Sequence, residues 1–420
     1  MNQFLGSETI NYHSYFLTRN PFPSIGVPEE EPSFYIEREN ETVIIARALA
    51  SSLRGSSTHL SIVAGYGNGK THLLRYIKKE IKKHLDKKNS EKILVGYIGS
   101  SGTSFREIYR CFMYDIGYDF FYELSWQIIG YTALKLIEKE KLNFTEEPKK
   151  VEAYLKRDLG SIKKLAEDGI VILSSLIKET KEEFLPLVKW QDFLVAFLQL
   201  IMEETSLLAW RWISGDPTYS EQRRELGIVT SIDTDERALQ IFMCIMRVLK
   251  TLGYDLICLL LDEFESIEML IPLKRQALLN SIRHLIDLNP GGLSLIIACT
   301  PETWSDVIRD YHAFSERILK KMALKPLNEQ KINTFVKEYL RSCRTVDRNE
   351  LIQMLNKRKM NIEDPELYPF TNEALKMLLE ASQGNIRRML SLCNIAIDSC
   401  CLASTQLIDP SALKKITDIF

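Results

Sequence analysis

Short apolar runs alternate with amphipathic helical patterns in two stretches of this chain. Four apolar runs are short enough to be strands, at 59–63, 93–98, 256–261 and 293–298. The last two are continuously apolar, which is typical of strands buried on both faces of a parallel sheet. Apolar residues at helical spacing occupy 37–53, 70–88, 235–252 and 272–288. This alternation predicts an α/β fold built on a parallel sheet.

The region between the second and third strands has a different pattern. Residues 104–234 carry several amphipathic helical stretches that are rich in aromatic residues. Such rings either pack a helical core or partner surface, or stack on single-stranded bases, and their apolar spacing favours packing. Trp210-Arg211-Trp212 is the best nucleic-acid candidate among them. From residue 328 the pattern is helical. The predicted parts are an N-terminal segment (1–46), a divided core (47–103 and 235–327), a helical insertion (104–234) and a helical C-terminal domain (328–420).

Composition and charge are those of an ordinary globular protein. The 420 residues hold 54 Lys and Arg against 56 Asp and Glu, for a net charge of -2. The whole chain therefore has no electrostatic pull toward nucleic acid or anionic membranes, and any such contact requires a local patch. No apolar run is long enough to span a membrane, and the N-terminus lacks a signal pattern. We expect a soluble, cytoplasmic protein whose eight cysteines are buried free thiols.

The segment from Ala64 to Thr71 fits the pattern of a phosphate-binding loop. Glycines permit backbone angles that turn successive N–H groups toward phosphate oxygens, and the helix that follows adds its positive N-terminus. Lys70 is expected to neutralise the β- and γ-phosphates, and Thr71 to offer its hydroxyl to Mg²⁺. The strand before the loop and the helix after it are the context that the motif requires. The predicted nucleotide contacts in this segment are Ala64, Gly65, Tyr66, Gly67, Asn68, Gly69, Lys70, Thr71 and His72.

Two later strands end in polar residues. The run 256–261 leads into Asp262 and Glu263. In a P-loop ATPase the first carboxylate holds Mg²⁺ through water, and the second orients and polarises the attacking water. The run 293–298 leads to Thr300, which is either a contact to the γ-phosphate or attacking water, or a residue of the turn at the strand's end. Together these residues predict ATP and Mg²⁺ as cofactors and ATP hydrolysis as the reaction.

The order of these motifs resembles the AAA+ superfamily, specifically its branch of Orc/Cdc6-like initiators and related ATPases. The segment Phe34 to Glu39 is similar to the box that lines the adenine pocket in this family, which implies contacts from Tyr35, Ile36 and Arg38. Ser315-Glu316-Arg317-Ile318 looks like the arginine-finger segment, and Gly384-Asn385-Ile386-Arg387-Arg388 looks like the sensor-2 motif of the helical lid. Ala64 stands where glycine is commoner, and Thr300 where asparagine is usual.

A narrower resemblance is to the ATP-binding proteins of bacteriophage-exclusion (BREX) systems, most of all to their smaller AAA+ member. It rests on short strings that occur in similar order and spacing. These are Trp212-Ile213-Ser214-Gly215, Glu225-Leu226-Gly227-Ile228, Leu252-Gly253-Tyr254 and Thr300-Pro301-Glu302.

The resemblance implies that ATP lies between the α/β core and the lid of a homo-oligomer. Arg387 would reach the γ-phosphate in cis, with Arg388 as the alternative. Arg317 would reach a neighbouring subunit's ATP, with Arg309 as the rival.

The implied function is a switch or motor that acts on DNA, or on a DNA-modifying partner, in phage defence. Too few residues follow the lid motif for the winged-helix domain of many initiators, so sequence-specific DNA binding is not expected. The lysines of helix 70–88 are interspersed with acidic residues, which favours a solvated face over a phosphate-contacting patch. The alternatives are a nucleotide-locked module that recruits a partner through 104–234, and a transposition or replication regulator of the same superfamily.

Overall fold

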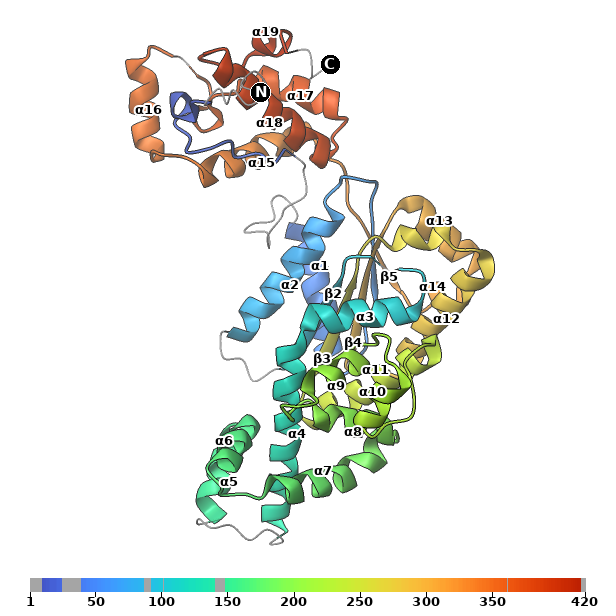
Figure 1. Ribbon diagram of the computed structural model, residues 1–420. Coiled ribbons are helices and arrows are strands. Elements are labelled where there is room, and N and C mark those ends of the chain that lie inside the picture. Colours follow the sequence, from blue (N-terminus) through green and yellow to red (C-terminus); the bar gives the residue numbers. More distant parts are fainter. Residues whose placement is uncertain are drawn as a thin grey trace, which may run out of the picture. The chain divides into compact units, whose positions relative to one another are not determined.

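The computed structural model describes residues 10–24, 39–86, 92–100, 102–139, 148–360 and 362–416. The chain divides into two compact units. The first unit comprises Met1–Ala46, Ile62–Lys79 and Met322–Phe420, and the second comprises Arg47–Ser61 and Glu80–Lys321. Each is described here by itself (Figure 1).

A five-stranded sheet has the order β2-β3-β4-β1-β5. Its strands are β1 (Leu60–Val63), β2 (Ile93–Ile98), β3 (Leu256–Leu261), β4 (Leu293–Cys299) and β5 (Lys320–Ala323). Strands β2, β3 and β4 pair in parallel, with Ile98 beside Leu261 and Leu261 beside Ile297. The carboxyl ends of these three strands therefore meet at one edge of the sheet, where parallel α/β folds bind ligands. All side chains of β1, β3 and β4 are buried, as their apolar runs predict.

The predicted α/β fold class is thus confirmed, and strands β2 and β3 have the predicted bounds. One strand is missing from the sequence prediction. Strand β5 has three exposed side chains and one buried side chain, Met322. A short strand of this composition carries no apolar run, so the periodicity of the sequence does not reveal it.

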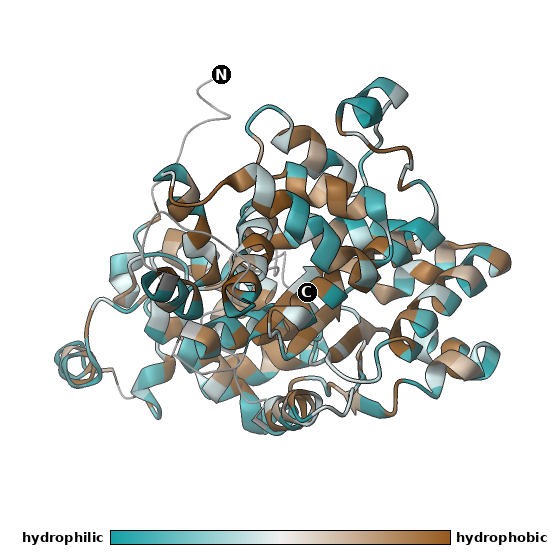
Figure 2. Ribbon diagram, turned by 90° about the horizontal axis from the view of Figure 1, so that it is seen from below, coloured by the Kyte–Doolittle hydropathy of each residue, from teal (hydrophilic) through white to brown (hydrophobic). Residues whose placement is uncertain are grey.

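Helices fill the long segment between β2 and β3. They are α3 (Phe105–Ile116), α4 (Tyr118–Glu138), α5 (Pro148–Arg157), the 3₁₀ turn η2 (Leu159–Ser161), α6 (Ile162–Glu167), α7 (Leu173–Val188), α8 (Gln191–Gln199), α9 (Ser206–Ile213), α10 (Ser220–Glu225) and α11 (Asp235–Thr251). Helix α4 is long, and α5, α6, α7 and η2 pack against it (Figure 1). Figure 2 shows helices with hydrophobic and hydrophilic residues on different sides, the pattern of elements that bury one face.

The aromatic residues of this segment pack against one another. Phe242 of α11 contacts the rings of Phe105, Tyr109 and Phe112. Trp210 packs against the rings of Tyr114, Tyr118 and Phe121. Trp212 is 1% exposed, and its indole N–H donates to the carbonyl of Thr230 at 2.8 Å. For these rings the packed-core interpretation is confirmed, with Trp212 buried and Trp210 half-buried.

The remaining elements of the second unit follow β3. They are the 3₁₀ turn η3 (Phe264–Met269), α12 (Pro272–Asp287), α13 (Pro301–Asp310) and α14 (His312–Ser315). Helices α1 (Glu39–Leu53) and α2 (Lys70–Asp86) each contribute residues to both units.

The first unit gathers the C-terminal helices around the N-terminal segment. Its elements are η1 (Tyr12–Tyr15), α15 (Glu329–Ser342), α16 (Arg348–Lys357), η4 (Pro365–Leu367), α17 (Asn372–Ser382), α18 (Ile386–Leu402) and α19 (Pro410–Leu413). Backbone bonds join Thr18 N–H to the Cys343 carbonyl at 2.9 Å and Thr345 N–H to the Phe16 carbonyl at 3.0 Å. In Figure 1 this blue segment lies among the red and orange helices. Residues 10–24, irregular by sequence, are thus part of the core of the helical domain.

Two expectations from composition are tested directly. Seven of the eight cysteines are buried free thiols, and Cys111 is exposed, because it lies on the outer side of α3. Within the described residues, none of the helices combines the length and the apolar character that crossing a bilayer requires.

Candidate nucleotide site

The loop from Ala64 to Thr71 joins β1 to α2, as the motif requires. Gly67 and Gly69 have φ of 75° and 86°, in the left-handed region that other residues rarely adopt. The N–H of Leu73 donates to the carbonyl of Gly69 at 2.9 Å, which closes the first turn of α2. The loop therefore ends at a helix N-terminus, where free N–H groups and the helix dipole favour an anion.

Lys70 is the buried cation of this loop. The residue is 7% exposed, its Nζ donates to the carbonyl of Ala64 at 2.9 Å, and the same atom lies 5.2 Å from the centre of the Tyr66 ring. Thr71 and His72 follow on the first turn of α2 and are half-buried. A buried ammonium beside a glycine-rich turn and a helix N-terminus is an electrostatic environment suited to a polyphosphate.

The lid helix α18 begins directly against this loop. Its N-cap is Asn385, whose side-chain oxygen accepts from the N–H of Arg388 at 3.0 Å. The side-chain nitrogen of Asn385 donates to the Tyr66 carbonyl at 2.6 Å, and the N–H of Arg387 donates to the Gly67 carbonyl at 3.0 Å. The phosphate loop and the predicted sensor-2 motif are thus brought together within the first unit.

A cavity of ≈ 640 Å³ opens between the loop and the lid helices of this unit. Both Arg387 and Arg388 line it, so the structure leaves both as candidate γ-phosphate contacts. Six lining residues were not predicted as contacts from the sequence: Ser24, Pro326, Ser382, Gln383, Asn385 and Ser391. Ser391 lies one helical turn after Arg387 and follows from the motif once the helix is placed. Ser24 has no local signal, since only the packing of the N-terminal segment brings it here.

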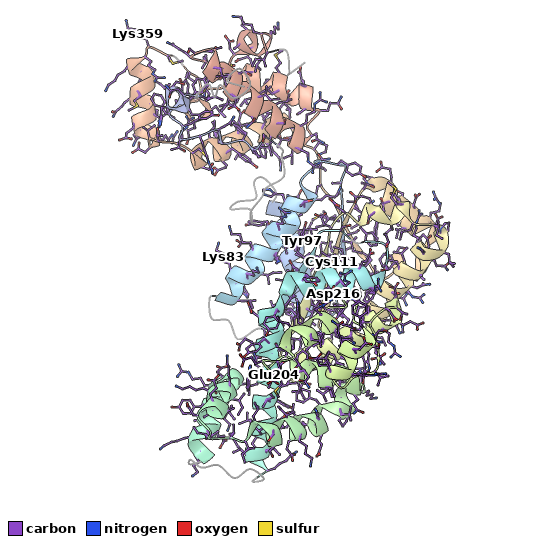
Figure 3. All side chains as sticks on the ribbon, viewed as in Figure 1. Lys83, Tyr97, Cys111, Glu204, Asp216 and Lys359 are labelled. Atoms are coloured by element: carbon purple, nitrogen blue, oxygen red, sulfur yellow. The ribbon has the colours of Figure 1, made fainter. Side chains whose placement is uncertain are left out.

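The acidic pair follows β3 in the second unit. Asp262 is 1% exposed, and its carboxylate accepts two hydrogen bonds. The donors are the N–H of Glu263 at 2.9 Å and the hydroxyl of Tyr97 at 2.9 Å. Figure 3 labels Tyr97 on the sheet beside α3. The carboxyl of Asp115 accepts from the backbone N–H of Tyr97 at 2.7 Å. Glu263 is exposed and has a left-handed φ of 47°, which directs the chain sharply into η3. Sequence reasoning did not find Tyr97.

Thr300 caps α13 and is 3% exposed. Its hydroxyl oxygen accepts from the Thr303 N–H at 3.3 Å and lies 2.8 Å from the Thr303 hydroxyl, which also contacts a carboxylate oxygen of Glu268. A carboxylate only accepts hydrogen bonds, so the Thr303 hydroxyl donates a hydrogen bond to Glu268. The Thr300 hydroxyl in turn donates a hydrogen bond to the Thr303 hydroxyl. In this arrangement the Thr300 hydroxyl serves the strand-end turn, and a bond from it to phosphate requires the hydroxyl to rotate.

Both candidate arginine fingers pair with carboxylates; Arg309 is exposed and Arg317 is half-buried. Arg317 Nε lies 3.0 Å from Asp287 Oδ1, and a second nitrogen lies 3.4 Å from Asp287 Oδ2. Arg309 lies 2.8 Å from Asp310 and 2.9 Å from Asp306. The candidate adenine contacts Tyr35, Ile36 and Arg38 lie outside the described residues.

Comparison with known families identifies part of the chain. The family model described as "BREX system ATP-binding protein BrxC/D" matches residues 202–387. This part of the chain is similar to the BREX BrxC/D family. The BrxC/D match takes in Asp262, Glu263, Thr300, Arg317 and Arg387, whereas the phosphate loop lies before it. The family covers BrxC and BrxD together, so the match confirms the resemblance to BREX ATP-binding proteins without separating the two.

Solved structures with a similar course of the chain include Orc and Cdc6 proteins. The Orc2 protein of Aeropyrum pernix, solved as ADPNP-ADP complexes, has a TM-score of 0.49 and 11% identity, over 94% of this chain and 71% of that one. The Orc1 protein of the same organism in complex with DNA has a TM-score of 0.46 and 12% identity, over 94% and 68%. Cdc6p from Pyrobaculum aerophilum has a TM-score of 0.41 and 11% identity, over 94% and 70%. No curated protein matches the chain.

The residues present fit the nucleotide that the BrxC/D description implies. Polyphosphate is matched by the N–H groups of a loop with two left-handed glycines, by Lys70 and by the two lid arginines. Mg²⁺ takes one or two protein oxygens in addition to phosphates and water, and the Thr71 hydroxyl and Asp262 carboxylate are oxygens of that kind.

Proposed function

We propose that this chain is an AAA+ ATPase that binds ATP with Mg²⁺ and hydrolyses it at subunit interfaces. One observation carries the proposal: the glycine loop and the two lid arginines line one cavity, and the same loop carries the buried ammonium of Lys70. A cavity with this concentration of donors and positive charge matches a triphosphate. The BREX match supports ATP as the nucleotide.

Each residue then has a defined task. Lys70 neutralises the β- and γ-phosphates, and Thr71 and Asp262 hold Mg²⁺, which supplies charge neutralisation when bound. Glu263 orients the attacking water. Arg387 contacts the γ-phosphate in cis, and Arg317 of a neighbouring copy stabilises the charge that develops in the transition state. Thr300 contributes through its hydroxyl after rotation away from Thr303.

For the biological role we propose the smaller AAA+ member of a BREX system. In that role the ATPase cycle drives assembly and disassembly of a homo-oligomer, which acts on DNA without sequence specificity or on a DNA-modifying partner. The net charge of -2 is consistent with local rather than global DNA contact.

Nucleotide affinity tests the first part. Lys70→Ala should abolish binding of a fluorescent ATP analogue, because the variant lacks the cation that offsets the phosphate charge. The matched control is Lys83→Ala on the same helix, where the lysine is 58% exposed and pairs with Glu80. Equal affinity of the wild type and Lys70→Ala for the ATP analogue would refute the proposed nucleotide site.

Turnover and particle mass test the second part. Glu263→Gln should bind ATP with wild-type affinity, lose turnover and hold the largest assembly, both with and without duplex DNA. Arg317→Ala and Lys70→Ala, each inactive alone, should regain activity when mixed, since a mixed interface pairs an intact nucleotide site with an intact finger. If Arg309→Ala is inactive alone and regains activity when mixed with Lys70→Ala, and Arg317→Ala does not, the arginine finger is Arg309. Binding without turnover under all conditions favours the nucleotide-locked module.

A further inference from the structure

The lid donates hydrogen bonds to two carbonyl groups of the phosphate loop. These bonds also fix the direction of the N–H groups in the same two peptides. Asn385 holds the carbonyl of Tyr66 at 2.6 Å, and the backbone of Arg387 holds the carbonyl of Gly67 at 3.0 Å. A trans peptide is planar, with its C=O and N–H in opposite directions. The two lid bonds therefore turn the N–H groups of Gly67 and Asn68 away from α18. These are amides of the kind that cradle phosphate in such loops.

Asn385 performs two opposite tasks with one side chain. Its oxygen accepts from the Arg388 N–H at 3.0 Å and caps α18, while its nitrogen donates to the loop at 2.6 Å. The reverse amide orientation would set oxygen against the Tyr66 carbonyl and N–H against N–H, so the partners fix the orientation. Aspartate would keep the cap and lose the donor. Asparagine provides the acceptor and the donor on two separate atoms, whereas serine or threonine would have only one hydroxyl oxygen for both.

The close approach also requires glycine at position 67. A Cβ on Gly67 would lie 2.4 Å from the Asn385 side-chain oxygen, well inside contact distance, and φ is 75° there. The glycine thus allows the lid to dock as well as allowing the loop to turn. The same region of α18 carries Arg387 and Arg388 into the cavity. The conformation of the phosphate loop is therefore linked to the positions of Arg387 and Arg388 through the neighbouring residue Asn385.

We propose that Asn385 is a positioning residue that couples the phosphate loop to the lid. The docked lid presets the amides of Gly67 and Asn68 for phosphate, and bound phosphate in turn favours the docked lid, because linkage acts equally in both directions. This inference rests on the proposed nucleotide binding. It goes beyond the contact that the sensor-2 arginine itself makes, since it assigns a task to the residue two positions earlier.

The test uses the full chain with Asn385→Asp and Asn385→Ala. Both remove the donor to Tyr66, but only Asn385→Asp keeps the helix cap, so its melting temperature should stay within about 1 °C of the wild type while Asn385→Ala melts lower. Affinity for a fluorescent ADP analogue, measured in EDTA, should fall roughly three- to tenfold in both variants, the range for one net hydrogen bond. Hydrogen exchange of the nucleotide-free protein should rise in both 64–71 and 385–391.

The outcomes separate the inference from the function on which it rests. A wild-type protein that binds no nucleotide overturns the proposed function. A wild type that binds, together with variants of unchanged affinity and exchange, overturns only the coupling. Lower affinity in Asn385→Asp but not in Asn385→Ala would trace the effect to the new negative charge and would also overturn it. Hydrogen exchange that increases in 385–391 but not in 64–71 would mean that Asn385 only caps α18, and would also overturn the coupling.

Discussion

The stability of the sheet should depend on pH through one buried histidine. His59 precedes β1, is 5% exposed, and its Nδ1 accepts from the backbone N–H of Leu295 in β4 at 3.2 Å. The proton of the neutral ring is therefore on Nε2. Burial lowers the pKa of His59 from 6.5 to about 4, because the protonated ring would lose its hydration and its acceptor.

The sign follows from proton binding in the two states. Between pH 6.5 and about 4 the unfolded chain binds a proton at His59 that the folded chain does not. Stability is therefore full above pH 6.5 and falls as the pH drops toward 4. One pKa unit corresponds to about 1.4 kcal/mol, which limits the total to about 3 kcal/mol. Roughly 2 kcal/mol of this should be lost between pH 7 and pH 5.

Comparison with His59→Asn isolates this contribution from the other titrating groups. Asparagine places an oxygen near the position of Nδ1 and keeps an acceptor for Leu295, but it does not titrate. Urea unfolding at pH 7 and pH 5 should show that the wild type loses about 2 kcal/mol more than the variant. Equal losses would mean that His59 is protonated in the folded chain, or is hydrated there, and would refute the reasoning.

Three further perturbations test other contacts. Gly130→Ala would place a Cβ 2.1 Å from the carbonyl oxygen of Leu159, so it should lower stability by about 1–3 kcal/mol in thermal unfolding. Arg344 is half-buried in the helical domain and donates to backbone carbonyls, including that of Tyr15 at 2.8 Å. Arg344→Met should cost about 3 kcal/mol and release the N-terminal segment to limited proteolysis. Tyr97→Phe removes one donor from Asp262 and should raise the Mg²⁺ concentration for half-maximal ATPase activity several-fold, with nucleotide affinity in EDTA unchanged.

The elements that sequence predicts well are those whose signal is local. Strand β3 needs six consecutive apolar residues to be buried on both faces, and those residues are adjacent in the sequence. The proposed phosphate loop likewise needs its glycines, Lys70 and Thr71 in one contiguous order, since phosphate binding would use consecutive backbone amides. For the same reason Asp262 and Glu263 follow directly from the strand that presents them.

What sequence does not predict depends on distant contacts. Ser24 reaches the cavity only because residues 10–24 pack into a helical core formed by the other end of the chain. Tyr97 reaches Asp262 because β2 and β3 are neighbours in the sheet, although 165 positions separate the two residues. Strand β5 has no apolar run, and its place at the sheet edge is fixed by pairing rather than by its own composition.

The two arginine candidates differ in how firmly they are held. Arg309 pairs with Asp306 and Asp310 of its own helix, has a side chain that is 68% exposed, and moves wherever α13 moves. The Arg317 side chain is 35% exposed and bonds to Asp287 at the end of α12 and to the Ala313 carbonyl of α14, so two elements fix its position. Solvent-exposed ion pairs contribute little to stability, so neither pair prevents exchange for a phosphate. A group that stabilises developing charge acts best when it is already in place. This favours Arg317, whose position is fixed by contacts to both α12 and α14.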